Sequence, residues 1–303
     1  MNAIPHPRAE SFSDPERLAD TRPDVVQDPA IGEIMSRANQ LTAEQVEQIL
    51  EHQKKTGLRF GEAAIALRHA SDDDVLFALA QQFHYPYAPV DKRALNPELV
   101  TAAEPFSRQA EAFRAIRGQL LTRVFTGEKP ARALAVISPN PGDGKTFFAA
   151  NLAVVLSQLG GRTLLIDADL RGPRQHDVFG IPNSQGLSGL LSGRAPRNVI
   201  CAIPHLPSLF LIPGGAVPPN PTELIERPAF SVLIRELTGK FDYVVIDTPA
   251  AWHGVDGVAV AQKCGAALCI ARQGKSKLAD LQDLVATLSS GTVTMAGVIM
   301  NEY

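Results

Sequence analysis

The stretch SPNPGDGKT, residues 138–146, decides how the rest of the chain is interpreted. It follows the apolar run ALAVI (133–137) and leads into GKTFFAANLAVVLSQLG (144–160), which has the composition of a buried helix. A glycine-bearing turn between a strand and a helix directs backbone N–H groups and the positive end of the helix dipole towards an anion. The stretch therefore predicts a phosphate-binding loop, although Pro139 replaces the first glycine of the pattern G-x-x-x-x-G-K-[ST].

Several residues of this loop are candidates for holding the phosphates of a nucleotide. Gly142 and Gly144 allow the backbone to close around phosphate oxygens, and Lys145 supplies positive charge. The Thr146 hydroxyl is a ligand of the kind that Mg²⁺ accepts. The predicted nucleotide-binding residues of the loop are Pro141, Gly142, Asp143, Gly144, Lys145, Thr146 and Phe147. We therefore expect this loop to bind ATP or GTP together with Mg²⁺.

Three carboxylates follow two further apolar runs. LLIDADLRGP (164–173) ends a strand with Asp167 and Asp169, and VVIDTPA (244–250) ends another with Asp247. The carboxyl ends of parallel strands meet at the edge where such sheets bind ligands. We expect Asp167 and Asp247 to hold Mg²⁺ with Thr146, and Asp167 or Asp169 to orient or deprotonate an attacking hydroxyl. With Lys145, these three aspartates form the predicted catalytic set.

Apolar runs recur through the second half of the chain, with helical stretches between most of them. The runs are ALAVI (133–137), TLLI (163–166), LFLI (209–212), YVVI (243–246), AALCIA (266–271) and AGVIM (296–300). Buried strands that alternate with helices favour a parallel sheet covered on both faces. The predicted fold class is therefore α/β, a P-loop nucleotide-binding fold with a mostly parallel sheet and a small all-α domain before it.

A different pattern occupies residues 29–90. IGEIMSRANQLTAEQVEQILEHQ (31–53) and FGEAAIALRHASDDDVLFALAQQ (60–82) align without a gap, which indicates a repeat of 29 residues with two short helices per unit. Thr42 and Ser71 share one position of the repeat and are expected to be N-caps. The predicted organisation is a disordered tail (1–28), a helical repeat domain (29–90), a linker (91–103) and the α/β domain (104–303).

Composition excludes several classes of protein. The 303 residues carry a net charge of -3 without a block of lysine and arginine, so we expect no nucleic-acid partner. Cys201, Cys264 and Cys269 form no C-x-x-C pair and suit a reducing compartment. No apolar run approaches the roughly 18 residues of a membrane span. We expect a cytoplasmic protein that reaches a membrane only through a partner.

The motifs at 138–146, 164–173 and 244–249 resemble the Walker A, A′ and B motifs of bacterial tyrosine kinases that control exopolysaccharide chain length. The EpsG-like type is the most similar, and the resemblance covers residues 104–303. It implies a MinD/ParA-like fold and an ATP-dependent protein tyrosine (auto)kinase that regulates polymerisation and export with a membrane polysaccharide copolymerase. It also assigns Arg171 to the nucleotide site and places Asn301 at the adenine base.

EAFRAIR (111–117) matches the E-x-x-R-x-x-R motif of the same kinases. Glu111, Arg114 and Arg117 lie along one stripe of a predicted helix, and the resemblance implies self-association into a homo-oligomer through them. An ion pair within the helix, worth about 0.2–0.5 kcal/mol, is the alternative explanation of this spacing.

Two other functions stay open. MinD/ParA-like ATPase switches share this fold, but they carry a signature lysine where Asn140 stands here. The other alternative is a non-enzymatic regulator in which ATP only shapes the surface offered to the copolymerase. Tyrosine kinases of this class usually end in a tyrosine cluster, and this chain has only Tyr303 at its end, so the phosphate acceptor is not identified.

The repeat resembles the N-terminal domain of type II secretion ATPases, some of which bind cyclic di-GMP. Arg59, Gly61 and Gln82 match that pattern, whereas Ala30, Asn39 and Arg68 replace an arginine and two glycines of it. Those glycines would let the backbone approach a flat dinucleotide. Their loss favours a protein-docking module, with cyclic di-GMP binding as the weaker alternative.

Overall fold

The computed structural model describes residues 31–38, 41–82, 95–127, 132–194 and 199–302. The chain divides into two compact units after Tyr87. Each unit has its own core and is described separately below.

The smaller unit contains the two helices per repeat that the alignment predicts. Its hydrophobic core contains Met35, Ile49 and Phe60, all of which are buried. Gly61 is required by packing, because a Cβ atom there would lie 2.6 Å from Cγ1 of Val75. The helices are α1 (Ile31–Ala38), α2 (Ala43–Thr56), α3 (Phe60–Ala66) and α4 (Asp72–Gln82).

Both predicted N-caps are confirmed. The Gln45 N–H donates to Thr42 Oγ1 at 3.2 Å, and the Thr42 N–H donates to Gln45 Oε1 at 2.9 Å. Ser71 and Asp74 make the same pair of bonds, at 3.2 Å and 2.8 Å. Each cap satisfies N–H groups that a helix start leaves without an internal partner.

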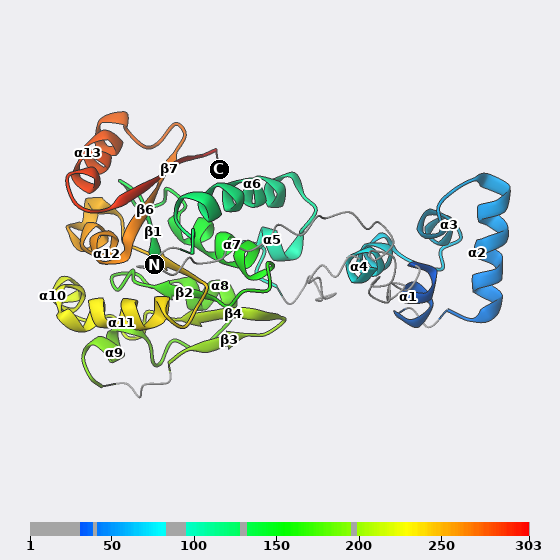
Figure 1. Cartoon of the computed structure of the whole chain (residues 1–303), viewed down its shortest axis with the longest axis horizontal. Coiled ribbons are helices and arrows are strands. Elements are labelled where there is room, and N and C mark those ends of the chain that lie inside the picture. Colours follow the sequence, from blue (N-terminus) through cyan, green and yellow to red (C-terminus); the bar gives the residue numbers. More distant parts are fainter. Residues whose placement is uncertain (1–30, 39–40, 83–94, 128–131, 195–198, 303) are drawn as a thin grey trace, which may run out of the picture. The chain divides into compact units, whose positions relative to one another are not determined.

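The larger unit is built around one sheet of seven strands (Figure 1). The strand order is β3-β4-β2-β5-β1-β6-β7, and all neighbouring pairs are parallel except β3 and β4. The strands are β1 (Ala133–Ile137), β2 (Thr163–Asp167), β3 (Cys201–Ile203), β4 (Leu206–Ile212), β5 (Tyr243–Asp247), β6 (Gly265–Arg272) and β7 (Thr294–Asn301). Because β1 lies between β5 and β6, the loop after it leaves the middle of the sheet.

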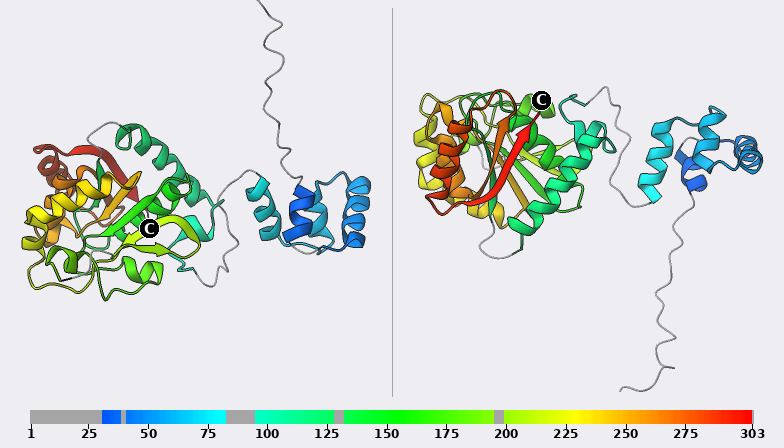
Figure 2. Two further views of the ribbon diagram at one scale, coloured as in Figure 1. Left: turned by 60° about the horizontal axis from the view of Figure 1, so that its bottom comes forward. Right: turned by 90° about the horizontal axis from the view of Figure 1, so that it is seen from above.

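Helices cover both faces of this sheet, as predicted. Figure 2 shows the teal-to-green helices of residues 108–157 on one face and the yellow-to-red helices of residues 221–289 on the other. Leu134 and Val136 of β1 pack into the core on the α6 and α7 face, and Ala135 and Ile137 into the core on the α11 and α12 face. The helices are α5 (Val100–Ala103), α6 (Arg108–Arg123), α7 (Lys145–Ser157), α8 (Gln175–Phe179), α9 (Leu187–Leu191), α10 (Pro221–Glu226), α11 (Pro228–Thr238), the 3₁₀ helix η3 (Ala251–His253), α12 (Asp256–Cys264) and α13 (Leu278–Ser289).

Strand β3 was not predicted. It has three residues, pairs antiparallel with β4 and is joined to it by a turn in which His205 has φ +65°. So short a strand carries little periodic signal, and the turn lacks the Asn-Gly or Asp-Gly pair that marks a hairpin.

The expected linker over 91–103 is corrected in its second half. Residues 100–103 form α5, and Leu99 is buried. The Asn151 carboxamide Oδ1 on α7 accepts from both the N–H and the hydroxyl of Thr101, each at 2.9 Å. These bonds make the segment part of the larger unit. The polar composition of the preceding residues 91–98 predicted a linker instead.

Among the described residues, no helix combines the length and the apolar composition that crossing a membrane would require.

Candidate functional site

The phosphate loop opens on a cavity of about 300 Å³. Gly142 and Gly144 have φ of +79° and +101°, a backbone conformation that favours glycine. Lys145 begins α7 and is only 7% exposed. The cavity is lined by Pro141, Gly142, Gly144, Lys145, Thr146, Phe147, Asp169, Arg174, Ala250 and His253. Six of the seven predicted loop residues are therefore gathered around one space.

Asp143, the seventh, braces the loop from within. Its Oδ2 accepts from the Asn140 N–H at 2.9 Å, and its Oδ1 accepts from the Ser276 hydroxyl at 2.8 Å. The Asp143 side chain is 1% exposed and lies outside the cavity lining. Asn140, at the signature-lysine position, donates from Nδ2 to Asp280 Oδ2 at 3.5 Å.

Asp167 and Asp247 are paired in register at the carboxyl ends of β2 and β5, and both are buried. Asp167 Oδ2 accepts from the N–H groups of Arg174 and Gln175 at 2.8 Å and 2.9 Å. Its Oδ1 accepts from the Asp169 N–H at 3.2 Å. Asp169 itself lines the cavity, so the three predicted carboxylates take different places at one edge of the sheet.

Gln175 joins this edge to the phosphate loop. Its Nε2 donates to Asp247 Oδ2 at 2.9 Å and to the Thr146 carbonyl at 3.0 Å. Sequence reasoning missed Gln175 and Arg174, because they follow the A′ motif with no spacing rule that marks them. Their position directly after that motif was the only signal.

The environment of the two buried carboxylates raises both pKa values. Burial raises the pKa of Asp247 to about 6, and the charge of Lys145 and hydrogen bonds from Thr146 and Gln175 lower it in part. Burial, followed by the charge of Asp247, raises the pKa of Asp167 well above its usual range. Burial of two neighbouring carboxylates therefore disfavours the ionisation of both.

This arrangement fits a magnesium ion. Asp247 Oδ1 is buried and accepts no hydrogen bond from the described residues. In the part of the chain that the structure describes, no three His, Cys, Asp or Glu side chains gather closely enough to hold a metal alone. Mg²⁺ commonly uses one or two protein oxygens together with phosphate and water. Thr146 and Asp247 are suited to that role, and Asp167 lies beside them.

Asn301 lies against the loop, next to a second cavity of about 370 Å³. Its Nδ2 donates to the Asp143 carbonyl at 3.0 Å, and Arg272 Nη1 donates to the Gly142 carbonyl at 3.3 Å. The second cavity shares Gly142, Gly144 and Phe147 with the phosphate cavity. The two spaces adjoin, which suits a ligand with a phosphate chain and a bulkier end.

Arg171 is not brought into either cavity. Its Nε lies 2.6 Å from Asp256 Oδ2, and its Nη2 donates to Thr222 Oγ1 at 3.4 Å. The Thr222 hydroxyl donates to Asp256 Oδ1 at 2.5 Å. The guanidinium thus ties the A′ loop to α10 and α12, and its contact with the nucleotide stays a prediction.

The predicted oligomerisation residues make contacts within the chain. Arg114 Nε lies 2.9 Å from Glu111 Oε2, which is the intrahelical pair given above as the alternative. Arg114 Nη2 donates to the Pro105 carbonyl, and Arg117 Nη1 to the Val155 carbonyl, both at 2.6 Å. Glu111 keeps 71% of its side chain exposed.

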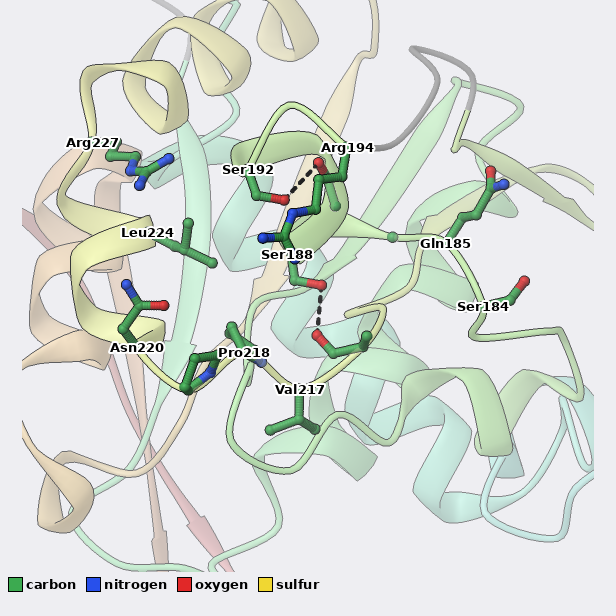
Figure 3. A pocket seen from close by; sticks show the side chains of 14 residues that line it. Ser184, Gln185, Ser188, Ser192, Arg194, Val217, Pro218, Asn220, Leu224 and Arg227 are labelled. Carbon is green, nitrogen blue, oxygen red and sulfur yellow. Dashed lines mark hydrogen bonds between the residues drawn. The ribbon is translucent and has the colours of Figure 1, made fainter.

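A separate cavity of about 450 Å³ lies between α9 and the loop before α10 (Figure 3). Arg194 and Arg227 line it, and none of the predicted site residues does. One wall is fixed by the Ser188 hydroxyl, which donates to the Ala216 carbonyl at 2.7 Å (Figure 3). This cavity is larger than the phosphate cavity, but no carboxylate lines it.

Comparisons with known proteins agree with the geometry of the phosphate loop. The profile of the CobQ/CobB/MinD/ParA nucleotide binding domain matches residues 134–303. The tyrosine-protein kinase Wzc of Salmonella typhimurium is 35% identical over 211 residues, which are 69% of this chain and 29% of Wzc. This chain therefore spans less than a third of that relative.

Shorter relatives and solved structures match over most of their length. The tyrosine-protein kinase CpsD of Streptococcus agalactiae is 33% identical over 63% of this chain and 82% of its own. The solved structure of the kinase domain of the Escherichia coli tyrosine kinase ETK is 31% identical in sequence, with a TM-score of 0.62 over 67% of this chain and 79% of that one.

Proposed function

Because the chain belongs to the CobQ/CobB/MinD/ParA family of nucleotide-binding domains and, within it, to the bacterial tyrosine kinases, we propose that it is an ATP-dependent protein tyrosine kinase. We place its role in exopolysaccharide polymerisation and export. One observation carries the proposal: the phosphate loop, Asp169 and the Asp167–Asp247 pair meet at one edge of the sheet.

In this proposal the loop amides and Lys145 hold the β- and γ-phosphates of ATP. Thr146 and Asp247 hold Mg²⁺, which neutralises the charge of the phosphates when it is bound. Asp169 faces the cavity and orients the acceptor tyrosine, taking the proton of its hydroxyl as the oxygen attacks the γ-phosphorus and ADP leaves. Asp167 fixes the positions of Arg174 and Gln175 through their N–H groups. Positioning and charge neutralisation lower most of the barrier.

The adenine base occupies the second cavity in this proposal, against Phe147 and Asn301. The Asn301 carboxamide donates to the loop carbonyl of Asp143, and this bond holds the side chain beside the second cavity. This placement supports ATP as the nucleotide and leaves the phosphates over Lys145.

Self-association through α6 is also proposed. Arg114 and Arg117 are engaged with carbonyl groups of the same chain, so the exposed Glu111 is the member best placed to contact a second copy. The acceptor is a tyrosine of another copy or of the membrane partner. Tyr303 lies outside the described residues.

The smaller unit is proposed as a docking module for the membrane copolymerase, which would hold a cytoplasmic chain at the membrane. Cyclic di-GMP is the alternative ligand. Arg68 is exposed and occupies a glycine position of the cyclic di-GMP pattern, where its φ is +57°. A side chain there supports docking over dinucleotide binding. Ala30 and Asn39 lie outside the described residues.

Mass spectrometry of the full-length chain after incubation with Mg-ATP tests the activity. Wild type is expected to gain phosphotyrosine, whereas Lys145→Ala loses it and Arg194→Gln, in the separate cavity, keeps it. ATP hydrolysis without phosphotyrosine would favour the MinD/ParA-like switch. ATP binding without turnover, with the membrane partner present, would favour the non-enzymatic regulator.

A further inference from the structure

Arg174 is a second cation of the phosphate cavity that no sequence motif marks. It lines the same space as Lys145, Thr146 and Asp169. The Arg174 N–H is held by Asp167 Oδ2 at 2.8 Å, so its backbone is anchored to the buried carboxylates. A guanidinium is a planar fork that pairs with phosphate oxygens through two parallel hydrogen bonds.

The Arg174 guanidinium is paired with Glu98, which precedes α5. Glu98 lines the second cavity, so the ion pair joins the rims of the two adjoining spaces. The side chains of Arg174 and Glu98 are 50% and 32% exposed. An ion pair this open to solvent is weak and yields readily to a more highly charged partner.

The backbone of Glu98 has a partner of its own, separate from the ion pair that its side chain makes. Its carbonyl accepts from Asn151 Nδ2 at 2.7 Å, and Thr101 is bonded to the same asparagine. The Glu98 carboxylate is therefore held within reach of Arg174 by a part of the fold that is buried. The carboxylate is thus placed to compete with any other anion for the Arg174 guanidinium.

We propose that Arg174 binds the terminal phosphate of the nucleotide and that Glu98 competes with that phosphate for the guanidinium. The inference rests on the proposed nucleotide site and adds a residue and a competition to it. When ATP binds, its γ-phosphate replaces the carboxylate of Glu98 as the partner of Arg174. The position of the Glu98 side chain thereby depends on whether the γ-phosphate is present.

Calorimetry on the full-length chain with Mg²⁺ tests this, using ADP and the non-hydrolysable ATP analogue AMP-PNP. Arg174→Gln is expected to weaken AMP-PNP binding by roughly 10- to 100-fold, as for the loss of a charge-assisted hydrogen bond, and ADP binding by less than about threefold. Glu98→Gln is expected to tighten AMP-PNP binding by about 3- to 10-fold, because the competitor is removed. In the Arg174→Gln background, Glu98→Gln should change nothing.

Arg194→Gln is the matched control, since it removes an exposed arginine from the separate cavity. An equal loss of ADP and AMP-PNP binding in Arg174→Gln would overturn the inference, and so would weaker AMP-PNP binding in Glu98→Gln. If Arg174→Gln fails to fold, AMP-PNP binding by Glu98→Gln tests the inference without it. A wild type that binds AMP-PNP but forms no phosphotyrosine contradicts only the proposed kinase activity. A wild type that binds neither nucleotide contradicts both.

Discussion

Asp167 and Asp247 stand opposite each other in register at the ends of two neighbouring parallel strands, and both are buried. Asp167 is surrounded by backbone N–H groups, whereas one oxygen of Asp247 has no partner among the described residues. The pair is an unfavourable feature of the ligand-free fold, and a cation or a proton relieves it.

Asp247→Asn should stabilise the magnesium-free protein at neutral pH. Burial raises the pKa of Asp247 to about 6, so between about pH 4 and 6 the folded state keeps a proton that the unfolded state has released. The free energy of unfolding therefore falls as the pH rises through this window. Removing the carboxylate should add up to roughly 3 kcal/mol at pH 7.5 and little at pH 4. Urea unfolding in EDTA measures both, with the exposed Asp283→Asn as control. An equal gain at the two pH values would contradict the explanation.

Gly144→Ala should damage the phosphate loop more than Gly142→Ala. Both positions have positive φ, which costs a non-glycine residue about 1–2 kcal/mol. Only at Gly144 would the new Cβ meet a neighbour, Asn301 Nδ2 at 2.3 Å, whereas nothing lies within 4 Å at Gly142. Nucleotide titration should show the larger loss for Gly144→Ala. Adding Asn301→Ala should reduce the loss of thermal stability, and no such relief would argue against the clash.

Asn151→Ala should loosen the junction between α5 and α7. The substitution leaves the buried N–H of Thr101 without its acceptor and the Glu98 carbonyl without its donor at 2.7 Å. Each buried group that loses its partner costs about 1–3 kcal/mol. Denaturant unfolding of the larger unit measures the change, and Gln119→Ala on the exposed side of α6 should stay within about 0.5 kcal/mol of wild type. A similar effect of the two variants would show that the junction contributes nothing.

Arg68→Gly should stabilise the smaller unit slightly. Arg68 has a left-handed backbone, which glycine adopts without the roughly 1–2 kcal/mol penalty of other residues, while glycine's entropy offsets part of the gain. Hydrogen exchange of the amides of α3 and α4 in the full-length chain should slow. Glu47→Gly, at an exposed position within α2, should have the opposite effect, because glycine destabilises a helix interior. Faster exchange in Arg68→Gly would contradict the explanation that the backbone of Arg68 is strained.

The sequence predicted the family and the fold correctly, and the comparisons and the sheet confirm both. These signals are local, because each apolar run lies next in the sequence to the glycine-rich turn or the carboxylate that follows it. The roles of the individual site residues stay predictions. The register that sets Asp247 beside Asp167 could be expected from the sequence, because parallel strands share one carboxyl edge.

Interactions between distant segments decided the rest. Arg171 was expected at the nucleotide and is paired with Asp256, 85 residues further along the chain. Arg174 was not singled out from the sequence, although it lines the phosphate cavity and pairs with Glu98. Part of the predicted linker forms α5, which is hydrogen-bonded to Asn151. The sequence by itself determined which groups form the phosphate loop and the acidic edge, since backbone conformation and periodicity are local properties. Only the tertiary structure decided where each charged side chain points, because a charge pairs with whichever opposite group the packing brings near it.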